Sequence, residues 1–297
     1  IAAAIGQSPL HEDIPEQPEP LFVAREKELA RLEQWLAEAL RGQGRVGFVV
    51  GEPGSGKTVL LREFARRAIE AHLELVAAGG TCNAYGGLGD SYLPFVEMLQ
   101  LLLGDVQAQR AAGALGREHA RRLREVGPDV LEAVLQVGPA LIDALLPASF
   151  LLERARALPG WATWEARVQG GIRNRPGGAS QVFLFNHVTR VLQAVARDHP
   201  LLLIVDDLQW ADAASISLLF HLGRRLAGSR ILVLGAYRPE EVAAGREGRP
   251  HPLQPVLLEL GALWDENEVD LAQAEGRAFV DALVDSEPNR LGAPFRE

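Results

Sequence analysis

The sequence is short of cysteine, of lysine and of net positive charge. Cys82 is the single cysteine in 297 residues, so no internal disulfide forms, and we expect a reducing, cytoplasmic environment. Lys27 and Lys57 are the only lysines, and arginine supplies the other 28 of the 30 basic side chains. Because 39 acidic residues leave a formal charge of -9, the chain as a whole lacks the basic surface that neutralises nucleic-acid phosphates. We therefore expect no direct binding of nucleic acid by this chain.

The sequence also lacks a long uninterrupted apolar run. Its most apolar long window, residues 131–152, contains Glu132 and Asp143, two carboxylates that a bilayer would have to bury, so a membrane role is not expected. The opening "IAAAIGQSPL" has no methionine and no basic segment before an apolar one. This argues against a signal peptide and suggests a piece of a longer chain. Residues 7–20 are rich in proline and acid, and residues 1–20 are expected to form a linker.

Short apolar runs alternate with amphipathic helical segments along most of the chain. Helical periodicity occurs at residues 25–41, 57–71, 94–103 and 181–196. Strands are expected at residues 45–50, 73–81, 200–207, 229–237 and 266–272. This alternation predicts an α/β fold with a parallel sheet that is covered by helices on both faces.

Residues 105–178 interrupt the alternation. They are rich in alanine, leucine and arginine, which favours helices. Breaks are expected at Gly127-Pro128, Gly138-Pro139, Pro147 and Pro159-Gly160. We interpret this region as a helical insertion between the second and third strands.

The segment "GEPGSGKT", residues 51–58, matches the phosphate-binding pattern G-x-x-x-x-G-K-[ST] between a predicted strand and a predicted helix. Glycines let backbone N–H groups point at phosphate oxygens, and the helix N-terminus adds positive partial charge. Lys57 is expected to reach the β and γ phosphates, and the Thr58 hydroxyl to ligate Mg²⁺. A turn that only joins a strand to a helix has no need of a lysine, and in this chain its basic residue would be expected to be arginine. We therefore predict adenine-nucleotide binding, with ATP or ADP contacted by Gly51, Pro53, Gly54, Ser55, Gly56, Lys57, Thr58 and Val59.

The third predicted strand ends in two acids, Asp206 and Asp207. Open α/β sheets bind ligands at the carboxyl edge of their strands. Asp206 is therefore the candidate to hold Mg²⁺ with Thr58, directly or through water. Asp207 is the candidate to orient or deprotonate the attacking water, and its alternative role is to cap the next helix.

Three further residues near this edge have competing interpretations. Asp212 directly precedes the next helix and is expected to cap it, and Trp210 is expected to pack in the core. Arg238 follows the fourth strand, where it is expected to sense and neutralise the γ phosphate. The alternative for Arg238 is an ion pair with Glu240 or Glu241.

Together these segments resemble the nucleotide-binding domain of the STAND class of P-loop ATPases, an AAA-like type found in large bacterial regulators such as the large ATP-binding LuxR-type proteins. The resemblance covers residues 21–297 and rests on "LFVAREKELARLEQWL", "GEPGSGKT", "LLLIVDDLQWADAASISLL" and "ILVLGAYRPEEV". It implies a three-layer P-loop NTPase sandwich with a five-stranded parallel sheet in the order 5-1-4-3-2. It also implies adenine contacts from Phe22, Val23 and Arg25, and catalytic roles for Lys57, Asp207 and Arg238. Lid, winged-helix and effector domains, usual in the family, are not recognisable in this sequence.

The expected function is an ATP/ADP-binding signalling switch within a larger regulatory protein. Homo-oligomers could form through that full-length protein. Mg²⁺-dependent hydrolysis is expected to be slow, well below about one turnover per second, because no arginine can be assigned as an arginine finger. Two alternatives stay open. One is an AAA+ initiator-like ATPase that loads on DNA, and the other is a scaffold that binds nucleotide without turnover.

Overall fold

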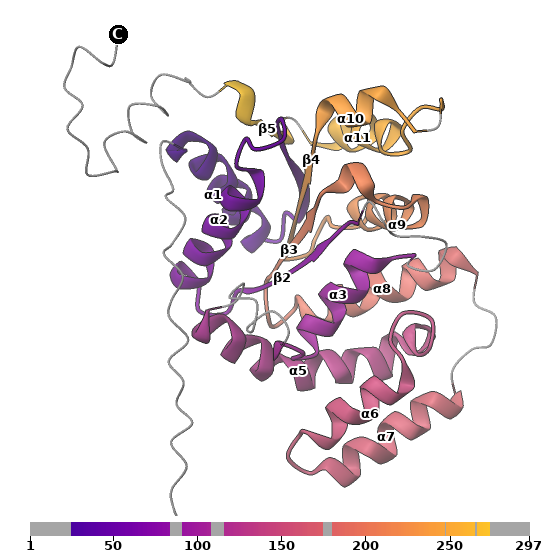
Figure 1. The fold of residues 1–297 in the computed structure, drawn as a ribbon. Helices are drawn as coiled ribbons and strands as arrows, with labels where there is room; N and C mark the ends of the chain where they lie inside the picture. The colour runs from indigo at the N-terminus through magenta and orange to yellow at the C-terminus, as the bar shows by residue number, and fades with distance from the viewer. Residues whose placement is uncertain are drawn as a thin grey trace, which may run out of the picture.

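The computed structural model describes residues 25–83, 91–107, 116–174, 180–246, 248–264 and 266–273. Its centre is a five-stranded sheet made of β1 (Arg45–Val50), β2 (Val76–Thr81), β3 (Leu201–Asp206), β4 (Ile231–Tyr237) and β5 (Glu268–Asp270). The strands are all parallel and lie in the order β2-β3-β4-β1-β5 (Figure 1). The predicted α/β fold and the predicted strand order 5-1-4-3-2 are thereby confirmed.

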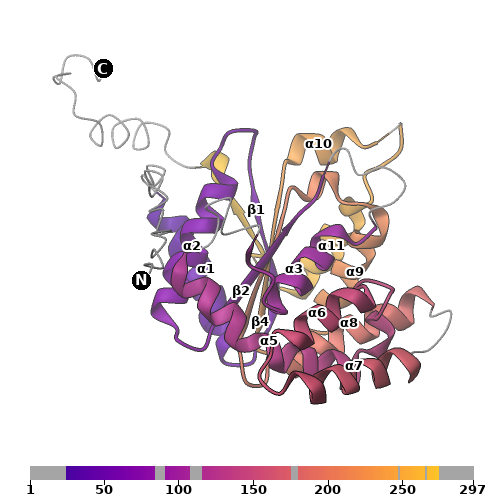
Figure 2. The ribbon, with the colours of Figure 1, turned by 60° about the horizontal axis from the view of Figure 1, so that its bottom comes forward.

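Helices cover both faces of this sheet, as Figures 1 and 2 show. One face is covered by α1 (Glu26–Leu40) and α2 (Lys57–Ala71). The other is covered by α3 (Leu93–Leu102), α8 (Gln181–Val195), α9 (Ala213–Gly223) and α11 (Leu253–Leu263). Three layers result, with the strands in the middle.

Alternating side chains of each strand supply two separate apolar cores. Leu202, Leu232 and Leu234 belong to the core under α1 and α2, while Leu201 and Leu203 belong to the core on the opposite face. Each of these leucines is at most 1% exposed. Burial on both faces explains why the strands appear in the sequence as continuous apolar runs.

The chain between β2 and β3 adds further helices after α3. They are α5 (Arg117–Val137), the short η1 (Pro139–Leu141), α6 (Ala148–Arg156) and α7 (Trp161–Asn174). The predicted breaks at Gly138-Pro139, Pro147 and Pro159-Gly160 fall between α5, α6 and α7, with Pro139 as the first residue of η1. Figure 2 shows α5, α6 and α7 gathered at one end of the molecule, and their apolar side chains belong to the core under α8 and α9.

The predicted break at Gly127-Pro128 is wrong, because α5 continues through both residues. Val126 and Val130 are at most 1% exposed and form part of one buried apolar face of this helix. Gly127 allows close approach to α3, since a Cβ on it would lie 3.2 Å from the carbonyl oxygen of Leu103. The cost of an internal proline, about 3 kcal/mol, is smaller than the combined gain from burying several such side chains at about 2 kcal/mol each.

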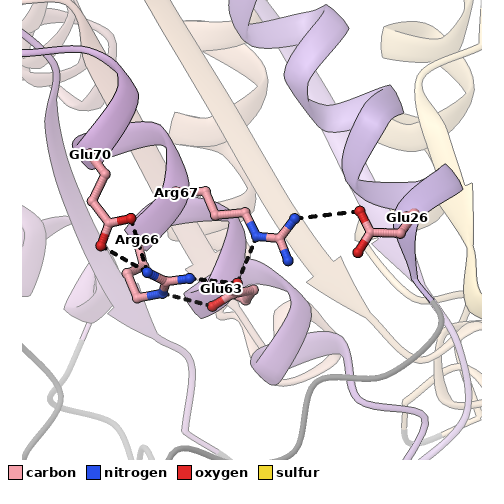
Figure 3. A network of polar contacts seen from close by, with 5 residues as sticks. All are labelled: Glu26, Glu63, Arg66, Arg67 and Glu70. Carbon is pink, nitrogen blue, oxygen red and sulfur yellow. Dashed lines mark hydrogen bonds and ion pairs between the residues drawn. The ribbon is translucent and has the colours of Figure 1, made fainter. Parts of the chain in front are cut away.

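The outer surfaces of α1 and α2 carry a network of ion pairs, drawn in Figure 3. Arg67 contacts Glu63 on its own helix at 2.7 Å and Glu26 on α1 at 3.4 Å. Arg66 lies between Glu63 and Glu70 at 2.8 Å from each. Solvent-exposed pairs of this kind contribute below about 1 kcal/mol each, so the leucine packing beneath them holds the two helices together.

The remaining elements are short and lie after β3, β4 and β5: η2 (Leu208–Trp210), α10 (Pro239–Ala244) and η3 (Leu271–Gln273). Among the described residues, no helix has both the length and the apolar character needed to span a membrane.

Two neighbouring glycines in β2 give a test of the packing between the sheet and α3. A methyl group on Gly80 would overlap the carbonyl oxygen of Pro94, whereas one on Gly79 would lie 3.5 Å from the carbonyl oxygen of Ile204, an ordinary contact. We expect Gly80→Ala to lower the free energy of unfolding by about 1 to 3 kcal/mol, and Gly79→Ala to change it by less than about 0.5 kcal/mol. Urea unfolding followed by circular dichroism measures both, and equal midpoints would contradict this packing.

Candidate functional site

The loop between β1 and α2 forms the predicted phosphate-binding turn. Gly54 and Gly56 have φ angles of +79° and +89°, in the left-handed region that favours glycine. A Cβ added to either would meet no atom within 4 Å, so the space beside them is open. Because α2 begins at Lys57, the amides of its first turn lack intrahelical acceptors and are available to an anion.

The Lys57 side chain folds back over this turn and is only 6% exposed. Its Nζ donates to the carbonyl oxygens of Gly51 at 2.8 Å and Glu52 at 2.9 Å. Burial, and then repulsion from Arg238, hold the pKa of Lys57 below its usual range. Neutral carbonyls are weaker partners for a buried ammonium group than a phosphate is, so this position favours an anionic ligand.

The two residues predicted to hold Mg²⁺ are in direct contact. The Thr58 hydroxyl donates to Asp206 Oδ2 at 2.7 Å, although the residues are 148 positions apart in the sequence. Asp206 Oδ1 accepts from the backbone N–H of Asp207 at 2.9 Å. Burial raises the pKa of Asp206, against the effect of the Thr58 hydrogen bond. A hydroxyl and a carboxylate at the mouth of the turn are the hard oxygen ligands that Mg²⁺ prefers.

Asp207 stands beside this pair and does not cap the next helix. It has a left-handed backbone with φ +55°, and its side chain is 22% exposed. Its Oδ1 accepts from Gln209 Nε2 at 2.7 Å and lies 3.8 Å from Arg238 Nη2. The predicted cap Asp212 is confirmed, since its Oδ1 accepts from the first backbone N–H groups of α9 at 2.9 Å.

Arg238 follows β4 at the same edge and is held by two side chains. Its Nη1 lies 2.6 Å from Glu241 Oε1, and its guanidinium carbon lies 4.8 Å from the centre of the Trp210 ring. The indole N–H of Trp210 donates to Glu241 Oε2 at 3.1 Å. Arg238 thus lies at the sheet edge where the γ-phosphate contact is expected, and it also makes the alternative ion pair with Glu241. Trp210 packs against the core only in part, because its ring also faces Arg238.

The predicted adenine contacts are only partly described. Phe22 and Val23 lie outside the described residues. Arg25 is described and contacts the back of the phosphate turn, donating to the carbonyl oxygen of Ser55 at 3.3 Å and to that of Leu271 at 3.2 Å. Val59 lies half-buried in the first turn of α2, and Pro53 is exposed on the loop.

Sequence reasoning missed Gln209. It is 2% exposed and contacts both Asp207 and the backbone N–H of Arg238. The one available signal was a polar residue between the apolar Leu208 and Trp210, and that pattern does not point to a site by itself.

Residues 21–234 match the AAA ATPase domain family, which accounts for most of the chain. The chain belongs to this family. Its members are P-loop NTPases, and the family implies nucleotide binding, typically with Mg²⁺. The matched part includes the phosphate turn, Asp206, Asp207 and β4 as far as residue 234. Arg238 lies four residues after it.

The AAA ATPase domain is also similar to an uncharacterized protein of Rhizobium meliloti (strain 1021). The two are 25% identical over an alignment of 261 positions, which covers 84% of this chain and 22% of that protein. The chain therefore spans about a fifth of the relative's length.

The residues present fit a magnesium–nucleotide ligand. Ser55 Oγ, in the phosphate turn, is buried and makes no hydrogen bond, although buried hydroxyl groups normally have a partner. The open space beside Gly54 and Gly56, the Lys57 ammonium and the Thr58–Asp206 oxygens complete a set suited to phosphate and Mg²⁺.

Asp206 gives a test that separates fold stability from binding. Burial raises the pKa of Asp206 because it disfavours the charged form, so a neutral side chain of the same shape removes that cost to the fold. An amide keeps the contacts, since its oxygen can accept from the Asp207 N–H while its NH₂ donates to the Thr58 hydroxyl. We expect Asp206→Asn to raise the melting temperature of the nucleotide-free protein and to abolish the additional stabilisation that Mg²⁺ gives with ATP. Differential scanning fluorimetry checks both, and a lower nucleotide-free melting temperature would refute the first expectation.

Proposed function

We propose that this AAA ATPase domain is the ATP/ADP-binding switch of a larger regulatory protein of the STAND class, with slow Mg²⁺-dependent ATP hydrolysis. The 2.7 Å contact between Thr58 and Asp206 carries this proposal. It brings the hydroxyl of a phosphate turn against the acid that ends β3, and these two oxygens are the protein groups that hold Mg²⁺ in P-loop NTPases.

The residues of the phosphate turn and Asp206 would each have a distinct role in nucleotide binding. Bound Mg²⁺ would neutralise phosphate charge and polarise the phosphoryl oxygens. Thr58 and Asp206 would hold it, with Asp206 acting directly or through water. Lys57 would exchange the carbonyl oxygens of Gly51 and Glu52 for phosphate oxygens, and the free amides of the α2 N-terminus would bind the remaining phosphate oxygens.

Two further residues serve the hydrolytic step. Asp207 would orient or deprotonate the attacking water through the carboxylate oxygen that Gln209 leaves free. Arg238 would leave Glu241 and neutralise the γ phosphate. An arginine finger accelerates such reactions by about 10³ to 10⁵. Among the described arginines, Arg238 alone forms an ion pair with Asp207, at 3.8 Å, so we propose slow turnover by the isolated chain.

The proposed regulatory role is supported by the length of the similar protein, and it agrees with the slow hydrolysis proposed above. The similar Rhizobium meliloti protein contains the matched region as 22% of its length, which is the arrangement of a module within a long chain. A domain that hydrolyses slowly spends long periods in each nucleotide state, and a switch needs such lifetimes because its output is a conformation or an assembly.

The chain's two lysines provide a matched test of binding. We expect wild type and Lys27→Ala to bind Mg-ATP and Mg-ADP, since Lys27 is exposed on α1. Lys57→Ala should bind at least about tenfold more weakly, because it loses a charge-assisted hydrogen bond to phosphate. Isothermal titration calorimetry measures all three proteins. Absence of binding heat with wild type at millimolar nucleotide would reject the proposed function.

The rate of ATP hydrolysis separates the proposed switch from a DNA-loading ATPase and from a scaffold without turnover. We expect hydrolysis below about one per second, unchanged by DNA, and slower in Asp207→Asn. Strong stimulation by DNA would favour a DNA-loading ATPase instead. Binding without any detectable phosphate release, in the intact protein as well as this chain, would favour a scaffold.

Glu241 offers a test of the role of Arg238. Removing its charge frees Arg238 from a half-buried ion pair worth about 1 kcal/mol, so Glu241→Gln should bind ATP about fivefold more tightly than wild type. ADP has no γ phosphate, and its affinity should stay within about twofold. Glu240→Gln is the control, because Glu240 is exposed and directly precedes Glu241 in the sequence. Equal tightening for ATP and ADP would show that Arg238 does not distinguish them.

A further inference from the structure

Gln209 is a buried polar residue whose side chain bridges two parts of the site. Its Nε2 donates to Asp207 Oδ1 at 2.7 Å, and its Oε1 accepts from the backbone N–H of Arg238 at 3.2 Å. The residue is 2% exposed. One amide therefore connects the acid after β3 to the first residue after β4.

The backbone of Gln209 is fixed as firmly as its side chain. Its carbonyl oxygen accepts from Arg246 and from His251 Nε2, the latter at 3.0 Å. His251 is 1% exposed, and its Nδ1 accepts from the backbone N–H of Leu253 at 3.1 Å. This bond fixes the neutral tautomer with hydrogen on Nε2, so the ring donates to Gln209. Arg246 also donates to the carbonyl oxygen of Ala211 at 2.9 Å.

We propose that Gln209 is a positioning residue for the hydrolytic step. Its amide holds the Asp207 carboxylate in a fixed position relative to Arg238. This inference rests on the proposed ATPase function. Gln209 occupies Asp207 Oδ1, the oxygen that lies 3.8 Å from Arg238 Nη2. Within the described residues, Asp207 Oδ2 makes no hydrogen bond, which leaves that oxygen to a water molecule.

An amide is the side chain that this position requires. It must donate to a carboxylate at one end and accept from a backbone N–H at the other, and a glutamine does both. A glutamate of the same shape would still accept from the Arg238 N–H. It would also set a second carboxylate against Asp207, which repels that side chain and turns it away.

The chemistry of the pair allows a swap experiment. In Gln209→Glu the two carboxylates repel, so we expect a lower melting temperature without nucleotide. In the double variant Asp207→Asn/Gln209→Glu, the new asparagine donates to the new glutamate and the hydrogen bond is restored with reversed polarity. We expect the melting temperature to return toward that of Asp207→Asn alone. Gln43→Glu is the control, because Gln43 is exposed and follows α1.

The rate of ATP hydrolysis should respond to these substitutions differently from the melting temperature. Displacement of a general base by about 1 Å lowers rates by about 10²-fold, so Gln209→Glu should lose about 10- to 100-fold in kcat while KM stays within about threefold. The swapped double variant should recover stability but not kcat, and it should be no slower than Asp207→Asn, because the group that Gln209 positions is already absent.

The outcomes separate this inference from the proposed function. If wild type hydrolyses ATP and Gln209→Glu keeps its kcat, or if its effect adds fully to that of Asp207→Asn, the positioning role is overturned while the ATPase function stands. If the swapped variant is as unstable as Gln209→Glu, the Asp207–Gln209 bond is not the contact that matters. If wild type binds no Mg-ATP in calorimetry, the proposed function and this inference fall together.

Discussion

The parallel pairing of β1, β3 and β4 is the constraint on which the site depends. In register, Val50 at the end of β1 lies beside Tyr237 of β4, and Thr81 of β2 lies beside Asp206 of β3. All carboxyl ends therefore meet at one edge, where the phosphate turn follows β1, Asp206 ends β3 and Arg238 follows β4. Such a sheet needs helical crossovers and burial on both faces, which the two apolar cores provide.

Each charged group at this edge has an internal partner that a ligand would have to replace or share. Lys57 is held by two carbonyl oxygens, Asp206 by the Thr58 hydroxyl, and Arg238 by Glu241. Two buried atoms of these described site residues, Ser55 Oγ and Arg238 Nε, make no hydrogen bond. A ligand shifts a conformational equilibrium only by its difference in affinity for the two states, and exchange of these internal contacts for phosphate contacts is one source of such a difference.

Sequence reasoning was reliable where a local pattern has one physical cause. The strands at β1 and β3 and the helix α2 follow from apolar runs, a glycine-rich turn and helical periodicity, and the order of the sheet followed from the family resemblance. It failed at Pro128, where tertiary burial of Val126 and Val130 overrides a strong local helix breaker. It also missed Gln209, because its distant partners are the residue that follows β4 and a histidine before α11, up to 42 positions away.

The backbone of Asp207 shows why those distant partners matter. A non-glycine residue in the left-handed region costs about 1 kcal/mol, and φ +55° therefore needs compensation from its surroundings. The Gln209 amide bonds Asp207 on one side and Arg238 on the other, while His251 and Arg246 hold the Gln209 carbonyl. Net hydrogen bonds of about 1 kcal/mol each are together enough to offset the strained residue. The left-handed residue turns the chain into η2 directly after β3, and this keeps the second acid at the sheet edge, five residues before the N-cap of α9 at Asp212.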